Sequence, residues 1–225
     1  ELMVLGDWPE AKEQWRHTLN QMQQAERARL GEVALERGWP DLATDAANAG
    51  ASWDRLDLRF PRGYWQIFQS VAEELGVDPY ELLSLARRES GLYPRARSKV
   101  NARGLMQLMP ATARSVAKER KEVYGGISSL YDPPTNIALG ATYYVNLLSR
   151  FGGNRVKALA AYNAGPSRVV RWTQREMAVD QWVDSIPFGE TREYVQAVLA
   201  YLVIYRASAE QPVNLLTSSE WETLY

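Results

Sequence analysis

Glu89 is the residue whose position is hardest to explain by structure alone. It follows Leu82 and Leu85 at spacings of seven and four residues, which places it on the apolar stripe of a helix, in its last turn. Burial and the negative end of the helix dipole both disfavour a charged carboxylate, so they should raise the pKa of Glu89. A carboxylic acid that stays protonated near neutral pH suits general acid catalysis of glycosidic bond cleavage. The alternative is a buried ion pair with Arg87, Arg88 or a more distant arginine, and position alone favours this alternative.

Three further segments carry polar side chains that could meet a sugar. Gln107 lies in the apolar run of residues 104–110, and amides of this kind hydrogen-bond hydroxyl and N-acetyl groups. Tyr162 and Asn163 come at the end of a helix, where polar tips can point into a cleft, and Glu190 precedes the last long helix. Each segment also has an ordinary structural interpretation: a surface glutamine, a helix C-cap, and a first-turn acid favoured by the helix dipole.

The composition excludes several classes of site. The chain of 225 residues has 0 cysteines and 1 histidine, so a disulfide framework, cysteine-bound zinc and a thiol nucleophile are ruled out, and a Ser–His hydrolase would depend on His17 alone. With 26 basic and 27 acidic residues, the net charge of -1 gives no overall field for binding nucleic acid. We expect no metal and no cofactor. The longest apolar run, residues 197–205, is too short for a membrane span, which needs about 20 residues.

The elements that must position these residues are helices. Apolar residues recur at helical spacing along almost the whole chain, which predicts an all-α protein. The helix of Glu89 should have Asp78 as its N-cap and Pro79 as its first residue, and Gly91 should end it. Other helices are expected at 65–75, 110–120, 133–151, 155–164 after the N-cap Asn154, and about 190–205. Residues 90–109 are punctuated by Gly, Ser and Pro and should be irregular.

The sequence pattern separates residues 1–61 from residues 62–225. Helical spacings recur before Gly50, with a stop and restart at Gly38 to Pro40, and Phe60-Pro61 has the character of a boundary. The first part is either the end of a helical repeat stack or a two- or three-helix cap on the main domain. Because the chain opens at Glu1 without a signal peptide, we expect it to be a piece of a longer, processed protein.

Three of the segments follow one another in a recognisable order: Glu89-Ser90-Gly91, then residues 104–110 (GLMQLMP), then residues 161–165 (AYNAG). In order and spacing they resemble the signature motifs of the soluble lytic murein transglycosylases, which have a catalytic domain like goose-type lysozyme. Residues 39–49 and 59–61, together with Trp15 and Trp53-Asp54, resemble the helical linker domain of the large periplasmic member of that family. Residues 185–194 are also similar to that member. The long helical superhelix of that member would lie upstream.

The resemblance implies that this chain cleaves the β-1,4 bond between N-acetylmuramic acid and N-acetylglucosamine in peptidoglycan. Glu89 would protonate the glycosidic oxygen and then act as a base on the muramic C6 hydroxyl. That hydroxyl would close a 1,6-anhydro ring, so no water is consumed. A second catalytic carboxylate is not needed, because the N-acetyl group of the substrate is thought to assist in this family.

Further site residues follow from the same resemblance. Ser98, Gln107 and Tyr162 would surround Glu89 and hold the N-acetyl group or the carboxylate in place. Tyr194 would support the acid. These roles are implied by matching positions in the motifs and not by the residues alone.

Three more residues are assigned to the substrate: Met109 would line the sugar subsites, Asn163 would shape the cleft near Tyr162, and Glu190 would line the peptide and saccharide groove. The chain departs from the family pattern at one point, since Asn101 stands where a glycine is usual before the 104–107 turn. Asn tolerates a left-handed backbone better than most residues, so we expect the turn to survive.

The resemblance also implies a periplasmic enzyme that acts as a monomer on peptidoglycan glycan strands, with cell-wall synthesis proteins as candidate partners. Two other functions remain open at this point. One is a hydrolytic lysozyme on the same fold, which needs a positioned water and usually a second acid. The other is a non-catalytic wall-binding module, against which the costly buried acid at position 89 argues.

Overall fold

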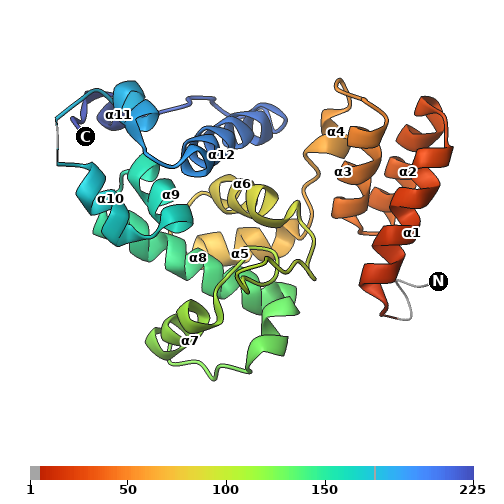
Figure 1. Cartoon of the computed structure of the whole chain (residues 1–225), viewed down its shortest axis with the longest axis horizontal. Coiled ribbons are helices and arrows are strands. Elements are labelled where there is room, and N and C mark those ends of the chain that lie inside the picture. Colours follow the sequence, from red (N-terminus) through yellow and green to blue (C-terminus); the bar gives the residue numbers. More distant parts are fainter. Residues whose placement is uncertain (1–5, 175) are drawn as a thin grey trace.

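The computed structural model describes residues 6–174 and 176–225, and their regular structure is helical, with isolated bridges but no strand. The prediction of an all-α protein is therefore confirmed. The first part of the chain holds α1 (Trp8–Gln21), α2 (Gln24–Glu36), α3 (Pro40–Ala49) and the short α4 (Leu56–Arg59). These four helices, called here the α1–α4 group, lie to one side of the molecule (Figure 1). They pack around their own small core, which includes Ala34, Leu42 and Leu58.

The middle of the chain forms the helices that surround Glu89. They are α5 (Trp65–Leu75), α6 (Pro79–Ser90), α7 (Pro110–Glu119), the 3-10 helix η1 (Ile127–Tyr131), α8 (Pro133–Arg150) and α9 (Arg155–Ala164). The capping predictions for Asp78 and Asn154 are confirmed, since the side chain of each accepts a backbone N–H of the first turn, and Asp132 caps α8 in the same way. Gly91 ends α6 in the left-handed region, at a φ of 64°.

The last part contains α10 (Pro166–Trp172), α11 (Val179–Ser185), α12 (Gly189–Ala207) and α13 (Ser218–Glu222). Neither α11 nor α13 is predicted by the sequence pattern, because both helices are short and lack a long apolar stripe. No helix in the part of the chain that the structure describes is both long and apolar enough to cross a membrane.

The main core lies around α6. Leu82, Leu83 and Leu85 of this helix have no exposed surface, and α6 packs against both α5 and α12. Figure 1 shows α6 near the middle of the larger part, with α12 along one side and α5 along another. Burying leucines on several sides of one helix contributes roughly 2 kcal/mol each. A rigid helix of this kind can hold the side chain at its C-terminal end in a fixed place.

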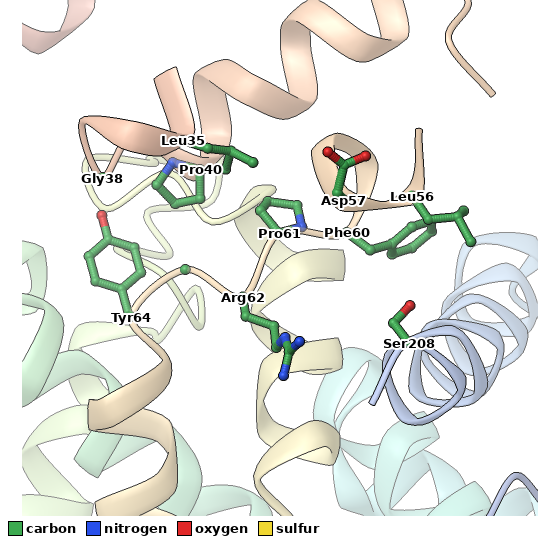
Figure 2. Close-up of a pocket in the computed structure, with 11 residues that line it drawn as sticks. Leu35, Gly38, Pro40, Leu56, Asp57, Phe60, Pro61, Arg62, Tyr64 and Ser208 are labelled. Atoms are coloured by element: carbon green, nitrogen blue, oxygen red, sulfur yellow. The ribbon is translucent and has the colours of Figure 1, made fainter. Parts of the chain in front are cut away.

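The α1–α4 group is joined to the main core by specific contacts of the two residues that precede Pro61. The ring of Phe60 lies 5.2 Å from that of Tyr201 and 5.8 Å from that of Tyr205, both in α12. Arg87 Nε of α6 donates to the carbonyl of Arg59 over 3.1 Å. A cavity of about 580 Å³ remains at this junction, and its lining includes Phe60 and Pro61 (Figure 2). None of the predicted site residues lines this cavity.

Candidate active site

Glu89 sits in the last turn of α6, where the helix leaves the core. Its neighbours Leu85 and Ala86 are fully buried, whereas its own side chain keeps partial exposure to solvent. Tyr194 of α12, which is 3% exposed, donates its phenol hydrogen to Glu89 Oε1 over 2.6 Å. The carboxyl group therefore lies at the edge of the core, and the buried Tyr194 holds one of its oxygens by a hydrogen bond. This matches the predicted apolar stripe, with the difference that the stripe reaches the surface at Glu89.

Electrostatics keep the acid form of Glu89 stable. Burial raises its pKa to about 7, and the charge of Glu190 acts in the same direction, while the hydrogen bond from Tyr194 and the charge of Arg88 oppose this rise. The alternative of an ion pair is not what the structure shows: among the described residues, Glu89 has no cationic group within 4.0 Å. Arg88 instead lies over the ring of Tyr194, 5.8 Å from its centroid.

The 104–109 turn lies beside the end of α6. Ser90 Oγ donates to the carbonyl of Leu105 over 2.8 Å, which ties the residue after Glu89 directly to the turn. Tyr162 of α9 donates its phenol hydrogen to the carbonyl of Met106, also over 2.8 Å. Burial and the nearby Glu89 carboxyl raise the pKa of Tyr162 well above its ordinary value, so its hydroxyl stays a donor. Sequence motifs far apart in the chain thus meet at this turn.

Gln107 has a strained backbone and a fixed amide. Its φ is 45°, in the left-handed region that non-glycine residues rarely adopt. Its Nε2 donates to the carbonyl of Ala96 over 3.2 Å and to that of Gly104 over 2.9 Å. The glutamine therefore closes its own turn, which excludes the ordinary interpretation of a surface glutamine with a free side chain.

Asn136 of α8 is the residue beneath this turn that sequence reasoning missed. It is 1% exposed, its Oδ1 accepts from Met106 N over 2.7 Å, and its Nδ2 donates to the carbonyls of Arg103 and Leu130 over 3.0 and 2.9 Å. The turn is packed so closely that a Cβ on Gly104 would stand 2.1 Å from the Leu130 carbonyl oxygen. A polar residue on an otherwise apolar helix stripe is the signal that could have identified Asn136.

Ser98 and Asn101 shape the irregular segment that leads into the turn. Ser98 Oγ accepts a hydrogen bond from the backbone N–H of Ala102 over 2.9 Å, so in this structure the side chain stabilises the loop. Asn101 has a φ of 77°, which confirms the prediction of a left-handed residue at the position where the family pattern has glycine. Met109, the N-cap of α7, is 40% exposed. Neither Ser98 nor Met109 forms a hydrogen bond with Glu89.

A second polar group links the end of α9 to the start of α12. Thr191 Oγ1 donates to Asn163 Oδ1 over 2.6 Å, and Asn163 Nδ2 donates to Glu190 Oε1 over 3.4 Å. The C-cap of α9 is Gly165, as predicted, but the Asn163 side chain bonds to other side chains and not to the helix backbone. Glu190 is exposed in the first turn of α12, which agrees with its interpretation as a first-turn acid. Its charge nevertheless acts to raise the pKa of Glu89.

The comparisons with known families agree with these motifs. The model of the Transglycosylase SLT domain matches residues 66–185, and that of the Soluble lytic murein transglycosylase L domain matches residues 1–56. A third model, the Soluble lytic transglycosylase helical domain, matches residues 185–213. The chain is 38% identical over 229 residues to the soluble lytic murein transglycosylase of Salmonella typhimurium, and 37% identical over 229 residues to that of Escherichia coli. Both matches cover 100% of this chain and 36% of the relative.

Solved structures of such enzymes superpose closely on this chain. The 70 kDa soluble lytic transglycosylase of Escherichia coli gives a TM-score of 0.94 at 36% identity, and a complex of the 70 kDa soluble lytic transglycosylase with bulgecin A gives 0.95 at 36% identity. An inactive mutant of the lytic transglycosylase Slt from Pseudomonas aeruginosa gives a TM-score of 0.90 at 35% identity. Each match covers 100% of this chain and 37% of the other, so the chain spans little more than a third of the length of these relatives. With a helical core that holds Glu89 and a family match over residues 66–185, the chain belongs to the transglycosylase SLT-domain family.

Proposed function

We propose that this chain is the catalytic part of a lytic transglycosylase that cleaves the β-1,4 bond between N-acetylmuramic acid and N-acetylglucosamine in peptidoglycan. The observation that carries the proposal is the carboxyl of Glu89, whose pKa is raised to about 7 and which Tyr194 holds over 2.6 Å at the edge of the core. An acid with such a pKa is still partly protonated at neutral pH and can also act as a base after it has given up its proton.

The proposed reaction uses Glu89 twice. In the first step its proton passes to the glycosidic oxygen, the bond from that oxygen to the muramic C1 breaks, and N-acetylglucosamine leaves. The N-acetyl group of the muramic residue assists at C1. In the second step the Glu89 carboxylate takes the proton of the muramic C6 hydroxyl, whose oxygen bonds to C1. The product is a 1,6-anhydromuramic end, and Glu89 regains its proton without any cofactor.

The remaining site residues have proposed roles that their contacts support. Tyr162 and Gln107, both anchored to the 104–109 turn, would hold the N-acetyl group beside Glu89, with Ser98 completing this wall. Tyr194 supports the acid directly. These assignments follow the family resemblance.

The other assigned residues have proposed contacts with the substrate. Met109 is exposed enough to line a sugar subsite, and Asn163 and Glu190 are linked by a hydrogen bond at the start of α12, where they would meet the saccharide and its peptide.

The organisation and location of the whole protein are also proposals. We infer a domain boundary at Pro61, with residues 1–61 as a linker domain and 62–225 as the catalytic domain. The separate small core of the α1–α4 group supports this boundary. The names of the relatives support a periplasmic location, where peptidoglycan glycan strands would be the substrate and cell-wall synthesis proteins the candidate partners.

The test is a digest of purified peptidoglycan followed by mass spectrometry of the products. Anhydromuropeptides, each one water lighter than the product of hydrolysis, are expected. Glu89→Gln should lower the rate by at least about 10²-fold while leaving the circular dichroism spectrum and melting temperature close to native. Glu73→Gln, which removes an exposed carboxylate of α5, is the matched control and should keep full activity.

Two results would contradict the proposal. Products with reducing ends would identify a hydrolytic lysozyme on this fold, and intact peptidoglycan would identify a binding module. Near-native turnover of folded Glu89→Gln would show that another group is the acid.

A further inference from the structure

A groove beside α12 lies outside the site described above, and it has a volume of about 320 Å³. Tyr194 of α12 donates to Glu89, whereas the next residue, Val195, lines the groove together with Leu199. The other walls come from α9, α11, α13 and residues 215–216. None of the residues predicted for the active site lines this groove, and α11 lies at the end of the molecule away from the α1–α4 group (Figure 1). The reaction assigned to Glu89 therefore does not explain it.

The lining of this groove, called here the α11–α13 groove, is mainly apolar. Val179 and Val183 of α11 are buried, as is Leu199 of α12. By contrast, Leu215 is 48% exposed and Trp221 of α13 is 58% exposed, and both line the same groove. Exposed apolar side chains are ordinary when they are scattered, but those that meet in one groove mark a surface that another molecule covers. Tryptophan is also among the residues that contribute most to binding between proteins.

The polar residues of the groove indicate the charge of that molecule. Asp180 and Asp184 of α11 both line the groove and are exposed, and neither forms an ion pair with a described residue. No Lys or Arg is among the described residues that line it. Residues 208–225, which follow α12, contain three Glu and no Lys or Arg. Acidic surroundings of this kind repel nucleic acid and anionic lipid, and they attract a cationic group.

The geometry of α11 indicates the form of the occupant. Asp180 and Asp184 are four residues apart, so they lie on the same face of the helix, about one turn from each other. A helix laid along the groove matches this spacing when its own Lys or Arg residues are also four positions apart. Helices that bind in apolar grooves place their apolar anchors on one face. The α11–α13 groove suits such a helix, because its apolar lining adjoins the two carboxylates.

We propose that the α11–α13 groove is a docking site for a cationic amphipathic helix of a partner protein. Apolar side chains of that helix pack against Leu215 and Trp221, and its Lys or Arg side chains pair with Asp180 and Asp184. Because Tyr194 and the groove lie on different faces of α12, the partner occupies a surface separate from Glu89. The proposal does not depend on the reaction assigned to Glu89.

The test uses a fluorescein-labelled synthetic peptide of about 16 residues, which is long enough to form a helix. Its leucines lie along one face, and two lysines four residues apart lie beside them. Fluorescence anisotropy should show saturable binding of this peptide to the wild-type chain. A second peptide, in which glutamate replaces both lysines, should bind about tenfold more weakly.

Two variants test the two parts of the groove. The double variant Asp180→Asn/Asp184→Asn should bring the dissociation constants of the two peptides to the same value, because it removes the charges that distinguish them. Trp221→Ala removes the exposed aromatic ring and should weaken the binding of both peptides about thirtyfold. Circular dichroism checks that each variant is folded.

The control is the double variant Glu13→Gln/Glu36→Gln, which removes two exposed carboxylates from α1 and α2 and should keep the preference for the lysine peptide. Equal affinity of the wild-type chain for the two peptides, or a preference that persists in Asp180→Asn/Asp184→Asn, would overturn the proposal, and so would the absence of saturable binding. Sedimentation of the chain alone tests for a second copy: a dimer that Trp221→Ala abolishes would assign the groove to self-association and overturn the separate partner. Since no peptidoglycan is present, none of these results depends on the proposed function.

Discussion

At the scale of single residues, the surroundings of Glu89 balance opposing effects on one proton. Burial and the charge of Glu190 favour the acid form, while the phenol of Tyr194 and the charge of Arg88 favour the carboxylate. The result is a pKa of about 7, where both forms are populated at neutral pH. A group that must first donate and later accept a proton works best with such a pKa.

This balance predicts how the pH profile should respond to two substitutions. Because Glu89 must be protonated to begin the proposed reaction, kcat/KM should fall as pH rises through about 7. Tyr194→Phe removes a hydrogen bond that stabilises the carboxylate, so it raises the pKa and moves the alkaline limb to higher pH. Glu190→Gln removes a like charge, so it lowers the pKa and moves that limb to lower pH. The pH dependence of kcat/KM on glycan strands measures both shifts.

The matched control is Glu193→Gln, an exposed carboxylate of α12, which should leave the alkaline limb in place. Limbs that move in the same direction for Tyr194→Phe and Glu190→Gln would show that these two residues do not act on Glu89 in the way described.

Much of the residue-scale chemistry could be predicted from the sequence. The spacing of Glu89 from Leu82 and Leu85 predicts both its place on the stripe and the direction of its pKa shift. The hydrogen bond from Tyr194 could not be derived from spacing, since the two residues are 105 positions apart and come together only when α12 packs on α6. The family resemblance was the source of that assignment.

At the scale of elements, α8 supports the site through one buried side chain. Asn136 bonds the backbone of the 103–106 segment and of Leu130 at three points, so the turn, η1 and α8 are held as one unit. Backbone carbonyls of the same turn also accept hydrogen bonds from Tyr162 of α9 and Ser90 of α6.

Asn136→Ala should therefore destabilise the protein more than a typical substitution. It leaves the backbone N–H of Met106 and the carbonyl of Leu130 buried without partners and removes one of the two donors to the carbonyl of Arg103, which costs about 3 kcal/mol in the free energy of unfolding. Asn146→Ala on the same helix, where the side chain bonds the exposed Glu119, should cost less than about 1 kcal/mol. Urea denaturation of the two variants measures the difference, and equal losses would mean that the turn is held by other contacts.

Helix bounds were predictable because capping residues and apolar stripes depend only on residues that are close together in the sequence. The sequence places α5 at 65–75, begins α6 at Pro79 after its cap Asp78, and ends α9 before Gly165, as the structure has them. The 96–108 loop was predicted only as irregular. Its conformation depends on the side chain of Asn136, which contributes contacts from another helix, and local propensity carries no information about these.

At the scale of the whole molecule, α13 near the C-terminal end is bound to the start of α9 by a buried ion pair. Glu220 of α13 is 3% exposed and accepts hydrogen bonds from Arg155 N and Nε at the start of α9, over 3.0 and 2.8 Å. Burial acts to raise the pKa of Glu220, but the bonds from Arg155 outweigh it and hold this pKa below the ordinary 4.5. The two residues are 65 positions apart, so no sequence pattern could have paired them.

Glu220→Gln should lower the free energy of unfolding by about 3 kcal/mol at pH 7, because the buried Arg155 loses its nearer counter-ion and keeps only Glu81, at 3.6 Å. Since the pKa of Glu220 is lowered by folding, its contribution is present above pH 4.5 and is lost as the pH falls below that value. The gap between wild type and Glu220→Gln should accordingly narrow in acid. Thermal melts across pH 3 to 7 provide the check, with Glu222→Gln at the exposed neighbouring position as the control. A gap that stays constant with pH would contradict the assignment.

Lys12 connects the α1–α4 group to the loop behind Glu89. Its Nζ bonds the buried Asp41 Oδ2 over 2.7 Å and also lies 4.3 Å from the ring centroid of Tyr93, four residues after Glu89. If residues 62–225 alone were joined to the N-terminal part of a homologue, Tyr93 would be separated from Lys12. Chimeras that keep helices α1 and α3 together with the 91–98 loop preserve the contacts of Lys12 with Asp41 and Tyr93. These three segments should therefore be exchanged together between homologues.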